Sequence, residues 1–271
     1  MNSSQGKNDI MYRVLTHLEE AEKFVNNDKY RIFGIFLVGS QNYHLDTEAS
    51  DVDTRVVVFP SMEDIATNKA PTNVEHHMPN GEHVTIVDFR LWMKQIKKQN
   101  IHELEVFFTD YYRIMAPYVD IWQQMYEMRE DIARYDAMRA MHSAVGIAFR
   151  YHGYIHNVHP NNEKSIDKFG YDPKSLSNLY RICDYLKKYK EGLPMKECLV
   201  PNDIEWLKMA KKGEIFTADS AKVSSDLLKS QLDKMKRYLA CVNIDRNEEV
   251  DNKFDEWSVM AFNQYLRMIV Y

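Results

Sequence analysis

The first half of the chain alternates short apolar runs with polar turns, a pattern typical of a small sheet. Residues 32–38 (Ile-Phe-Gly-Ile-Phe-Leu-Val) form an almost unbroken apolar run, which suits a strand buried on both faces. Further extended runs cover residues 56–59, 73–78 and 82–87, and an Asn-Gly pair between the last two is a strong hairpin signal. Residues 10–25 show helical spacing, so we expect a helix packed against this sheet.

From about residue 117 the strand signals fade and apolar residues recur at helical spacing. Asp172 followed by Pro173 marks a helix start, since Asp is favoured at the N-cap and Pro at the first helical position. We therefore predict an α+β fold, with a small mixed sheet and flanking helices over residues 1–115 and an all-helical domain over residues 116–271. The expected helices cover residues 117–128, 131–157, 172 onward, 202–212, 217–241 and 254–271 (the last as a helix or a strand-like tail), with a charged loop at 161–168 and a polar break at 246–252.

Two acidic residues precede the second strand, in the sequence Ser-Asp-Val-Asp. Because strand side chains alternate, Asp51 and Asp53 should point to the same side. Two carboxylates that close repel each other, and a divalent cation between them removes the repulsion. Hard oxygen ligands suit magnesium, which keeps several waters and is often shared with substrate phosphates. We interpret Asp51 and Asp53 as ligands of Mg²⁺, with Mn²⁺ as the alternative ion.

A Gly-Ser turn ends the first strand. Gly39 and Ser40 would offer backbone N–H groups and a hydroxyl to an anion where a helical segment opens. Phosphoryl or nucleotidyl transfer requires at least a phosphate-binding site beside a metal-binding site. Metal-dependent glycosyltransferases also use an Asp-x-Asp pair and are the enzymatic alternative, although they do not need the Gly-Ser turn.

The stretch from Gly-Ser-Gln-Asn-Tyr to Ser-Asp-Val-Asp-Thr resembles the signature of the nucleotidyltransferase superfamily that includes DNA polymerase β. It is similar to a bacterial and phage branch sometimes labelled as polymerase-β-like proteins of RNA repair. The resemblance implies a nucleotidyltransferase fold in the N-terminal domain, with Gly39 and Ser40 holding a nucleoside triphosphate. This chain departs from the branch at His44, where the branch usually has glycine, so the shape of that turn is in question.

In that superfamily a third metal-binding carboxylate comes from a later strand. Asp88 ends the run 82–87 and is our candidate for this ligand; the alternative interpretation is an N-cap for the next helix, and Glu82 and Glu75 are weaker candidates. Two further charges, Glu103 and Glu105, lie in the apolar segment 100–108, where Glu103 is interpreted as a residue that supports the fold.

The second stretch that resembles the branch is Gly-Tyr-Asp-Pro-Lys-Ser-Leu-Ser-Asn-Leu-Tyr-Arg. Lys174, Asn178 and Arg181 fall at i, i+4 and i+7 and so on one helix face. Lys174 and Arg181 match the branch, whereas Asn178 replaces its usual histidine. The resemblance implies that Lys174 and Arg181 contact the triphosphate or the acceptor across a cleft between the two domains. The alternative is a purely structural role, as a surface helix with ordinary salt bridges.

These features predict an enzyme that moves a nucleoside monophosphate from a nucleoside triphosphate to an acceptor hydroxyl and releases pyrophosphate. Its catalytic residues would be Asp51, Asp53 and Asp88. An RNA 3′ end ranks first as the acceptor, followed by a protein side chain and a small molecule. A nucleotide-binding regulatory protein that has lost turnover is the alternative outside the enzymes.

The composition limits the partners and the cellular location that we expect for this protein. The net charge of −5 over 271 residues argues against tight nonspecific binding to long nucleic acid, which depends on neutralising phosphates. Three scattered cysteines lack metal-type spacing, and neither a signal-peptide core nor a membrane-spanning run is present. We expect a cytoplasmic protein of a bacterium or a phage-infected cell, with no membrane partner.

Overall fold

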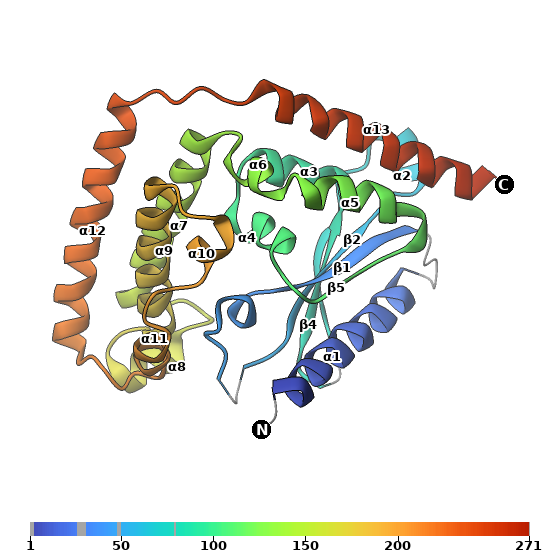
Figure 1. Cartoon of the computed structure of the whole chain (residues 1–271). Helices are drawn as coiled ribbons and strands as arrows, with labels where there is room; N and C mark the ends of the chain where they lie inside the picture. The colour runs from blue at the N-terminus through green and yellow to red at the C-terminus, as the bar shows by residue number, and fades with distance from the viewer. Residues whose placement is uncertain (1–2, 26–30, 48–49, 79, 271) are drawn as a thin grey trace. The chain divides into compact units, whose positions relative to one another are not determined.

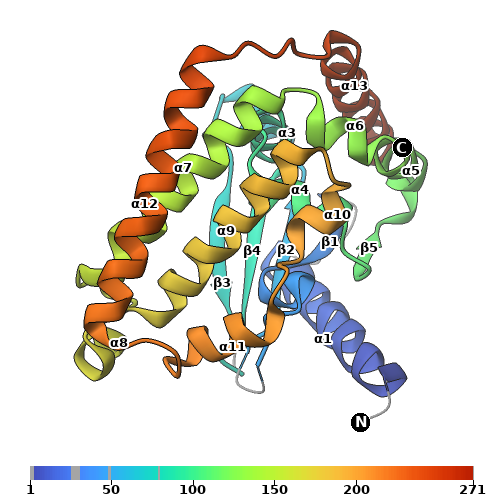
Figure 2. The ribbon, with the colours of Figure 1, turned by 60° about the vertical axis from the view of Figure 1, so that its left-hand side comes forward.

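The computed structural model describes residues 3–25, 31–47, 50–78 and 80–270 (Figures 1 and 2). The fold is α+β, as the sequence predicts: a small mixed sheet with flanking helices is followed by a helical region. None of the helices, over these described residues, is long and apolar enough to cross a membrane.

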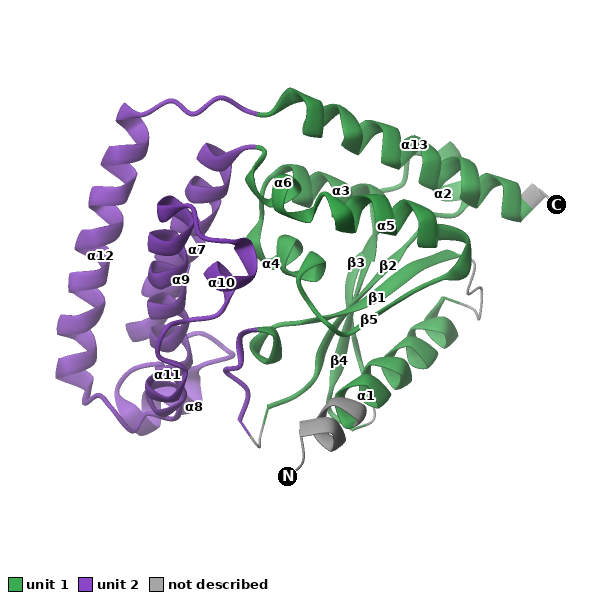
Figure 3. Ribbon diagram, viewed as in Figure 1, with its two compact units in different colours: residues 1–42, 49–135, 247–271 green, residues 43–48, 136–246 purple. Residues whose placement is uncertain are grey.

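The chain forms two compact units (Figure 3). Unit 1 comprises residues 1–42, 49–135 and 247–271, and unit 2 comprises residues 43–48 and 136–246. The sequence predicted a single division near residue 115. The last helix instead returns to the sheet-bearing unit, because its aromatic side chains complete the core beside the sheet: Phe262 and Tyr265 lie 5.4 and 5.0 Å from the ring of Phe59.

Unit 1 is built on a five-stranded sheet with the order β3-β4-β2-β1-β5. Strands β2 and β4 pair in parallel, and the other three pairs are antiparallel. The short strand β5 was not predicted, since three residues are too few to show alternation. The strands are β1 (Ile32–Val38), β2 (Asp53–Val58), β3 (Asn73–His77), β4 (His83–Asp88) and β5 (Tyr112–Ile114).

Helices cover both faces of this sheet. On one face α1 (Ser3–Phe24) buries Val14, Leu18 and Ala21 in an aliphatic cluster with strand residues. On the other face lie α3 (Phe89–Lys97), α5 (Val119–Glu127) and α13 (Glu248–Val270) (Figure 1). Aromatic rings of these helices pack against rings on β1 or directly after β2, as in the pairs Phe33–Trp92, Phe36–Trp122 and Phe59–Phe262. The predicted polar break at 246–252 is largely the first turn of α13, so that prediction was wrong.

Short helices connect these elements. Ser61 with Asp64 three residues later has the spacing of a helix start, and the two residues form a capping box at the beginning of α2 (Met62–Ala66). The remaining short segments of this part of the chain are η2 (Ser40–Tyr43), α4 (Ile101–Leu104), η3 (Glu105–Phe107), η4 (Ala116–Tyr118) and α6 (Arg129–Arg134).

In unit 2, α9 packs against α7, α10, α11 and α12. Asp172 caps α9 as predicted, accepting a hydrogen bond from the Lys174 N–H. Two predictions were wrong: residues 161–168 are mostly helix α8, and the single helix expected over 131–157 is broken before Asp136, which caps α7 instead. The helices are α7 (Ala137–His156), α8 (Glu163–Phe169), α9 (Pro173–Glu191), α10 (Met195–Leu199), α11 (Ile204–Lys212) and α12 (Ala218–Cys241).

The turn after η2 contains a strained position. His44 has a φ of +58°, in the left-handed region where a Cβ atom is unfavourable. It is also the position at which the nucleotidyltransferase branch that this sequence resembles usually has glycine. The backbone thus takes the glycine-type conformation although the residue is histidine.

We predict that His44→Gly stabilises the protein by about 1 kcal/mol, because the left-handed conformation costs a non-glycine residue about 1–2 kcal/mol and the added freedom of glycine in the unfolded chain offsets part of the gain. Urea unfolding of wild type and variant measures the difference. His44→Ala keeps the Cβ and serves as the control, with no gain expected. A His44→Gly protein that is less stable than wild type would show that the imidazole makes a compensating contact.

Candidate active site

The Asp51–Asp53 segment lies beside the Gly-Ser turn, because β1 and β2 are neighbours and Val38 is in register with Asp53. Gly39 has a φ of +85°, and a Cβ placed on it would lie 2.8 Å from Oδ2 of Asp53. Only glycine therefore lets the carboxylate lie against the backbone here. Asp51 is exposed and the Asp53 side chain is 36% exposed, so both carboxylates are accessible to a ligand.

The backbone N–H of Gly39 is engaged within the protein. It donates to Oε2 of Glu105 at 3.3 Å, and the Asn42 side chain lies 3.5 Å from the same oxygen. The segment η2 that follows has only four residues. A helix-terminus phosphate site formed by the N–H of Gly39, as the sequence suggested, therefore does not fit this geometry. Glu105 was not among the predicted site residues, although its charge in an apolar segment was a signal.

Asp88 lies at the far end of the sheet from Asp53. Because β2 and β4 run parallel, Thr54 is level with Val84 and Val58 with Asp88, which puts Asp88 roughly 16 Å along the strand from the level of Asp53. Asp88 is buried, caps α3 through the Arg90 N–H, and forms an ion pair with the Arg90 guanidinium at 2.7 Å. The structure therefore does not bring Asp88 to the acidic pair, and the alternative N-cap interpretation describes it.

His83 occupies the place on β4 beside Asp53. Its Nε2 atom lies 3.2 Å from Oδ1 of Asp53 and 3.1 Å from Oε1 of Glu75. The sequence did not single out His83, because its proximity to Asp53 depends on the register between two strands separated by a helix and a third strand. The imidazole thus lies within hydrogen-bond distance of one carboxylate on β2 and one on β3.

The side chains available as ligands determine how a metal ion could be bound. No group of three or more His, Cys, Asp or Glu side chains is arranged to hold a metal ion in the described part of the chain. The three-carboxylate set of Asp51, Asp53 and Asp88 is thus not formed. Two carboxylates still suit magnesium where waters and substrate phosphates complete its coordination. The residues fit an ion that arrives with a nucleotide better than one held by protein ligands alone.

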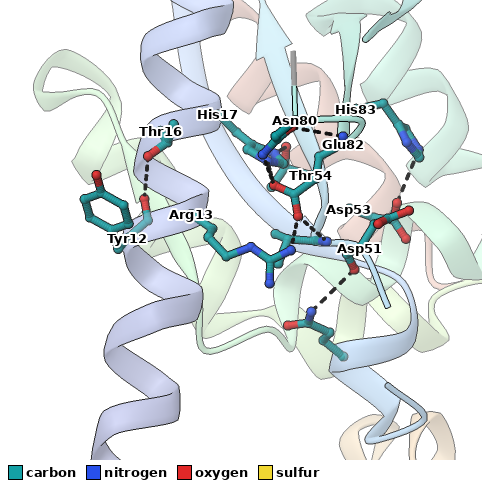
Figure 4. A network of polar contacts seen from close by, with 12 residues as sticks. Tyr12, Arg13, Thr16, His17, Asp51, Asp53, Thr54, Asn80, Glu82 and His83 are labelled. Atoms are coloured by element: carbon teal, nitrogen blue, oxygen red, sulfur yellow. Dashed lines mark hydrogen bonds and ion pairs between the residues drawn. The ribbon is translucent and has the colours of Figure 1, made fainter. Parts of the chain in front are cut away.

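A buried polar network lies on the other side of the acidic segment (Figure 4). The carboxylate of Glu82 accepts hydrogen bonds from Arg13, from the Val52 N–H at 3.0 Å, from His17 at 3.0 Å and from Asn80 at 2.8 Å. Burial alone would raise the pKa of Glu82, but the hydrogen bonds from Arg13, Val52, His17 and Asn80 outweigh it and lower the pKa to about 2. Glu82 is therefore ionised at neutral pH.

In unit 2, the two predicted phosphate-binding residues differ in their surroundings. Lys174 is exposed, whereas Arg181 is buried at 2% exposure, and its guanidinium lies 4.0 Å from the ring centroid of Tyr43. Among the described residues, neither Nε nor Nη1 of Arg181 has a hydrogen-bond partner. Buried donors without a hydrogen-bond partner are costly, so these two nitrogens are suited to an anionic ligand.

Known proteins show little similarity to this chain. No family model matches the sequence, and no curated protein matches it. Among solved structures, the chain is similar to a nucleotidyltransferase-like protein from Exiguobacterium sibiricum 255-15, with 10% sequence identity and a TM-score of 0.30. The similarity covers 82% of this chain and 75% of that one.

We predict that Glu82→Gln lowers the free energy of unfolding at pH 7 by about 2 kcal/mol, as expected when hydrogen bonds to a buried charge are lost. The folded-state pKa lies below the ordinary value of 4.5, so the contribution of the ionised carboxylate is complete above about pH 4.5 and is lost as the pH falls toward 2. The difference between wild type and variant should shrink over that interval in urea unfolding curves. A difference that stays constant with pH would contradict the role of the charge.

Proposed function

We propose that the protein is a metal-dependent nucleotidyltransferase that transfers a nucleoside monophosphate from a nucleoside triphosphate to an acceptor hydroxyl. The acceptor oxygen would attack the α-phosphorus in line and its hydroxyl proton would pass to solvent, while the bond between the α- and β-phosphates would break and pyrophosphate would depart. Such transfers depend on positioning and charge neutralisation more than on covalent chemistry by the protein.

The observation that carries this proposal is the Asp53 carboxylate lying against the bare backbone of Gly39, with Asp51 exposed nearby in the chain. Gly39 follows the last residue of β1 and Asp53 begins β2, and these two strands are neighbours in the sheet. An accessible acidic pair beside a glycine turn gives room for phosphate groups close to the carboxylates. A purely structural role would favour burial of these acids.

Each residue has a role in this proposal. Asp51 and Asp53 would hold magnesium, or manganese in its place; when bound, the ion neutralises charge on the phosphates. Ser40 would offer its hydroxyl to a phosphate oxygen. Lys174 and Arg181 would contact phosphates as cations. The buried guanidinium of Arg181 supports this assignment most directly, because its Nε and Nη1 atoms have no hydrogen-bond partner among the described residues. Asp88 has no part in this mechanism.

The acceptor stays a proposal based on resemblance. An RNA 3′ end ranks first, because the Gly39–Asp53 stretch resembles the branch labelled for RNA repair. A protein hydroxyl and a small molecule follow. Screening of acceptors with a labelled nucleotide would distinguish them.

A second candidate function is a nucleotide-binding regulatory protein without turnover. It is favoured by one observation: the acidic pair lacks the third carboxylate expected of a catalytic site, since Asp88 caps a helix elsewhere. Release of pyrophosphate from bound triphosphate separates the two functions.

We predict that nucleoside triphosphate with Mg²⁺ raises the melting temperature of the wild-type protein and that Asp51→Asn and Asp53→Asn each abolish this rise, because ligand that binds only the folded state stabilises it by mass action. Thermal unfolding with each ribo- and deoxyribonucleoside triphosphate, with and without Mg²⁺, measures the effect. Asp120→Asn removes an exposed carboxylate on α5 and serves as the matched control, with the rise retained. Variants of both aspartates that keep the full rise would show that the acidic pair does not hold the metal.

We predict that Arg181→Met makes the free protein more stable by about 1 kcal/mol, because methionine replaces, at similar volume, a buried charge of which two nitrogens have no hydrogen-bond partner among the described residues. The same variant should lose most of the melting-temperature rise with triphosphate. Lys188→Met is the control on the same helix: Lys188 is also buried but is satisfied by Asp184 at 3.0 Å and the Val200 carbonyl at 2.6 Å, so its loss should destabilise. A loss of stability in Arg181→Met equal to that of the control would argue against an anion-binding role.

A further inference from the structure

The carboxylate of Glu82 joins three parts of unit 1 that are distant in sequence (Figure 4). Arg13 and His17 reach it from α1, one turn apart on the same helix face. Asn80 reaches it from the turn between β3 and β4, and the Val52 N–H reaches it from the acidic segment. Both carboxylate oxygens are used, Oε1 by Arg13 and Val52 and Oε2 by His17 and Asn80.

The peptide unit between Asp51 and Val52 is held on both sides. Its N–H, which belongs to Val52, donates to Glu82 at 3.0 Å. Its carbonyl oxygen, which belongs to Asp51, accepts from the Gln41 side chain at 3.4 Å, a long hydrogen bond. The Val52 side chain is completely buried. The orientation of this peptide determines the direction in which the Asp51 side chain leaves the backbone.

His17 extends the same network to the residue after Asp53. Its ring is completely buried, with Nδ1 2.8 Å from the Thr54 hydroxyl and Nε2 3.0 Å from Glu82. An ionised carboxylate can only accept, so Nε2 carries the hydrogen that points to Glu82. Val52 and Thr54, the two neighbours of Asp53, are thus both tied to the same buried network.

Stability alone does not account for this arrangement. Apolar side chains of similar size often stabilise a buried site at least as well as charged ones. Helix α1 already covers the sheet with such residues at Val14 and Leu18. A fully hydrogen-bonded polar network instead rigidifies its surroundings and selects one geometry.

We propose that Glu82 is a positioning residue that fixes the backbone of the Asp51–Asp53 segment, and that Arg13 and His17 hold Glu82 in place. Helix α1 is then part of the site and not only a cover for the sheet. The effect on backbone geometry stands independently of the nucleotidyltransferase proposal; the effect on metal affinity rests on it.

The test compares Glu82→Gln and Arg13→Gln with Val14→Ala. Arg13 is one-third exposed, so its variant removes one donor at little risk to folding. Val14 is the buried neighbour of Arg13 and lies outside the network, so Val14→Ala is a control for lost stability alone. The measurements are hydrogen exchange of the Val52 amide relative to the Ile35 amide of β1, a strand that is paired on both sides, and binding of Mn²⁺, alone and with ATP, by electron paramagnetic resonance.

We expect Val52 exchange to rise at least tenfold relative to Ile35 in Glu82→Gln, and less in Arg13→Gln, with Mn²⁺ binding weakened in the same order. Val14→Ala should change neither quantity. Unchanged Val52 protection in both network variants would overturn the proposal, as would an equal loss of Mn²⁺ binding in Val14→Ala. If wild type binds no Mn²⁺ but Val52 protection is lost as expected, the nucleotidyltransferase proposal fails while the positioning role is supported. Should Glu82→Gln not fold, Arg13→Gln decides.

Discussion

The parallel pairing of β2 with β4 is the constraint on which the candidate site depends. In this register Asp53 lies beside His83 at one end of the paired strands, and Asp88 lies at the other end of β4. A hairpin between the same strands would reverse β4 and bring its other end to Asp53. Because the chain passes through α2 and β3 before β4, the strand returns in the parallel direction. The composition of the site is thus a consequence of topology.

The acidic segment has two different surroundings. On the side of Gly39 and His83 it is accessible, and a carboxylate lies against bare backbone. On the side of α1 it rests on a buried network centred on Glu82. The network holds the acidic segment on its buried side, while its carboxylates stay accessible to solvent. This arrangement suits a ligand-binding site, because preorganised groups need not reorganise when a charged ligand arrives.

Two buried cationic residues on α9 of unit 2 differ in their hydrogen-bond partners. Lys188 is satisfied by a carboxylate and by backbone carbonyls, as a structural charge is expected to be. Arg181 has an aromatic ring beneath it and no hydrogen-bond partner for two of its nitrogens among the described residues. The difference separates a residue that stabilises the helical unit from one that is suited to bind an anion.

The sequence by itself determined the local elements: the first strand, the hairpin, the capping box at Ser61 and the Asp172 cap follow from alternation, turn residues and hydrogen-bonding side chains that act within a few positions. It also located Gly39 beside the acidic pair. Only the tertiary structure decided that Asp88 caps a helix, that His83 and Glu105 approach the site, and that Glu82 supports it. The contacts of His83, Glu105 and Glu82 join residues 30 or more positions apart, and they depend on strand order and register, which local patterns do not encode.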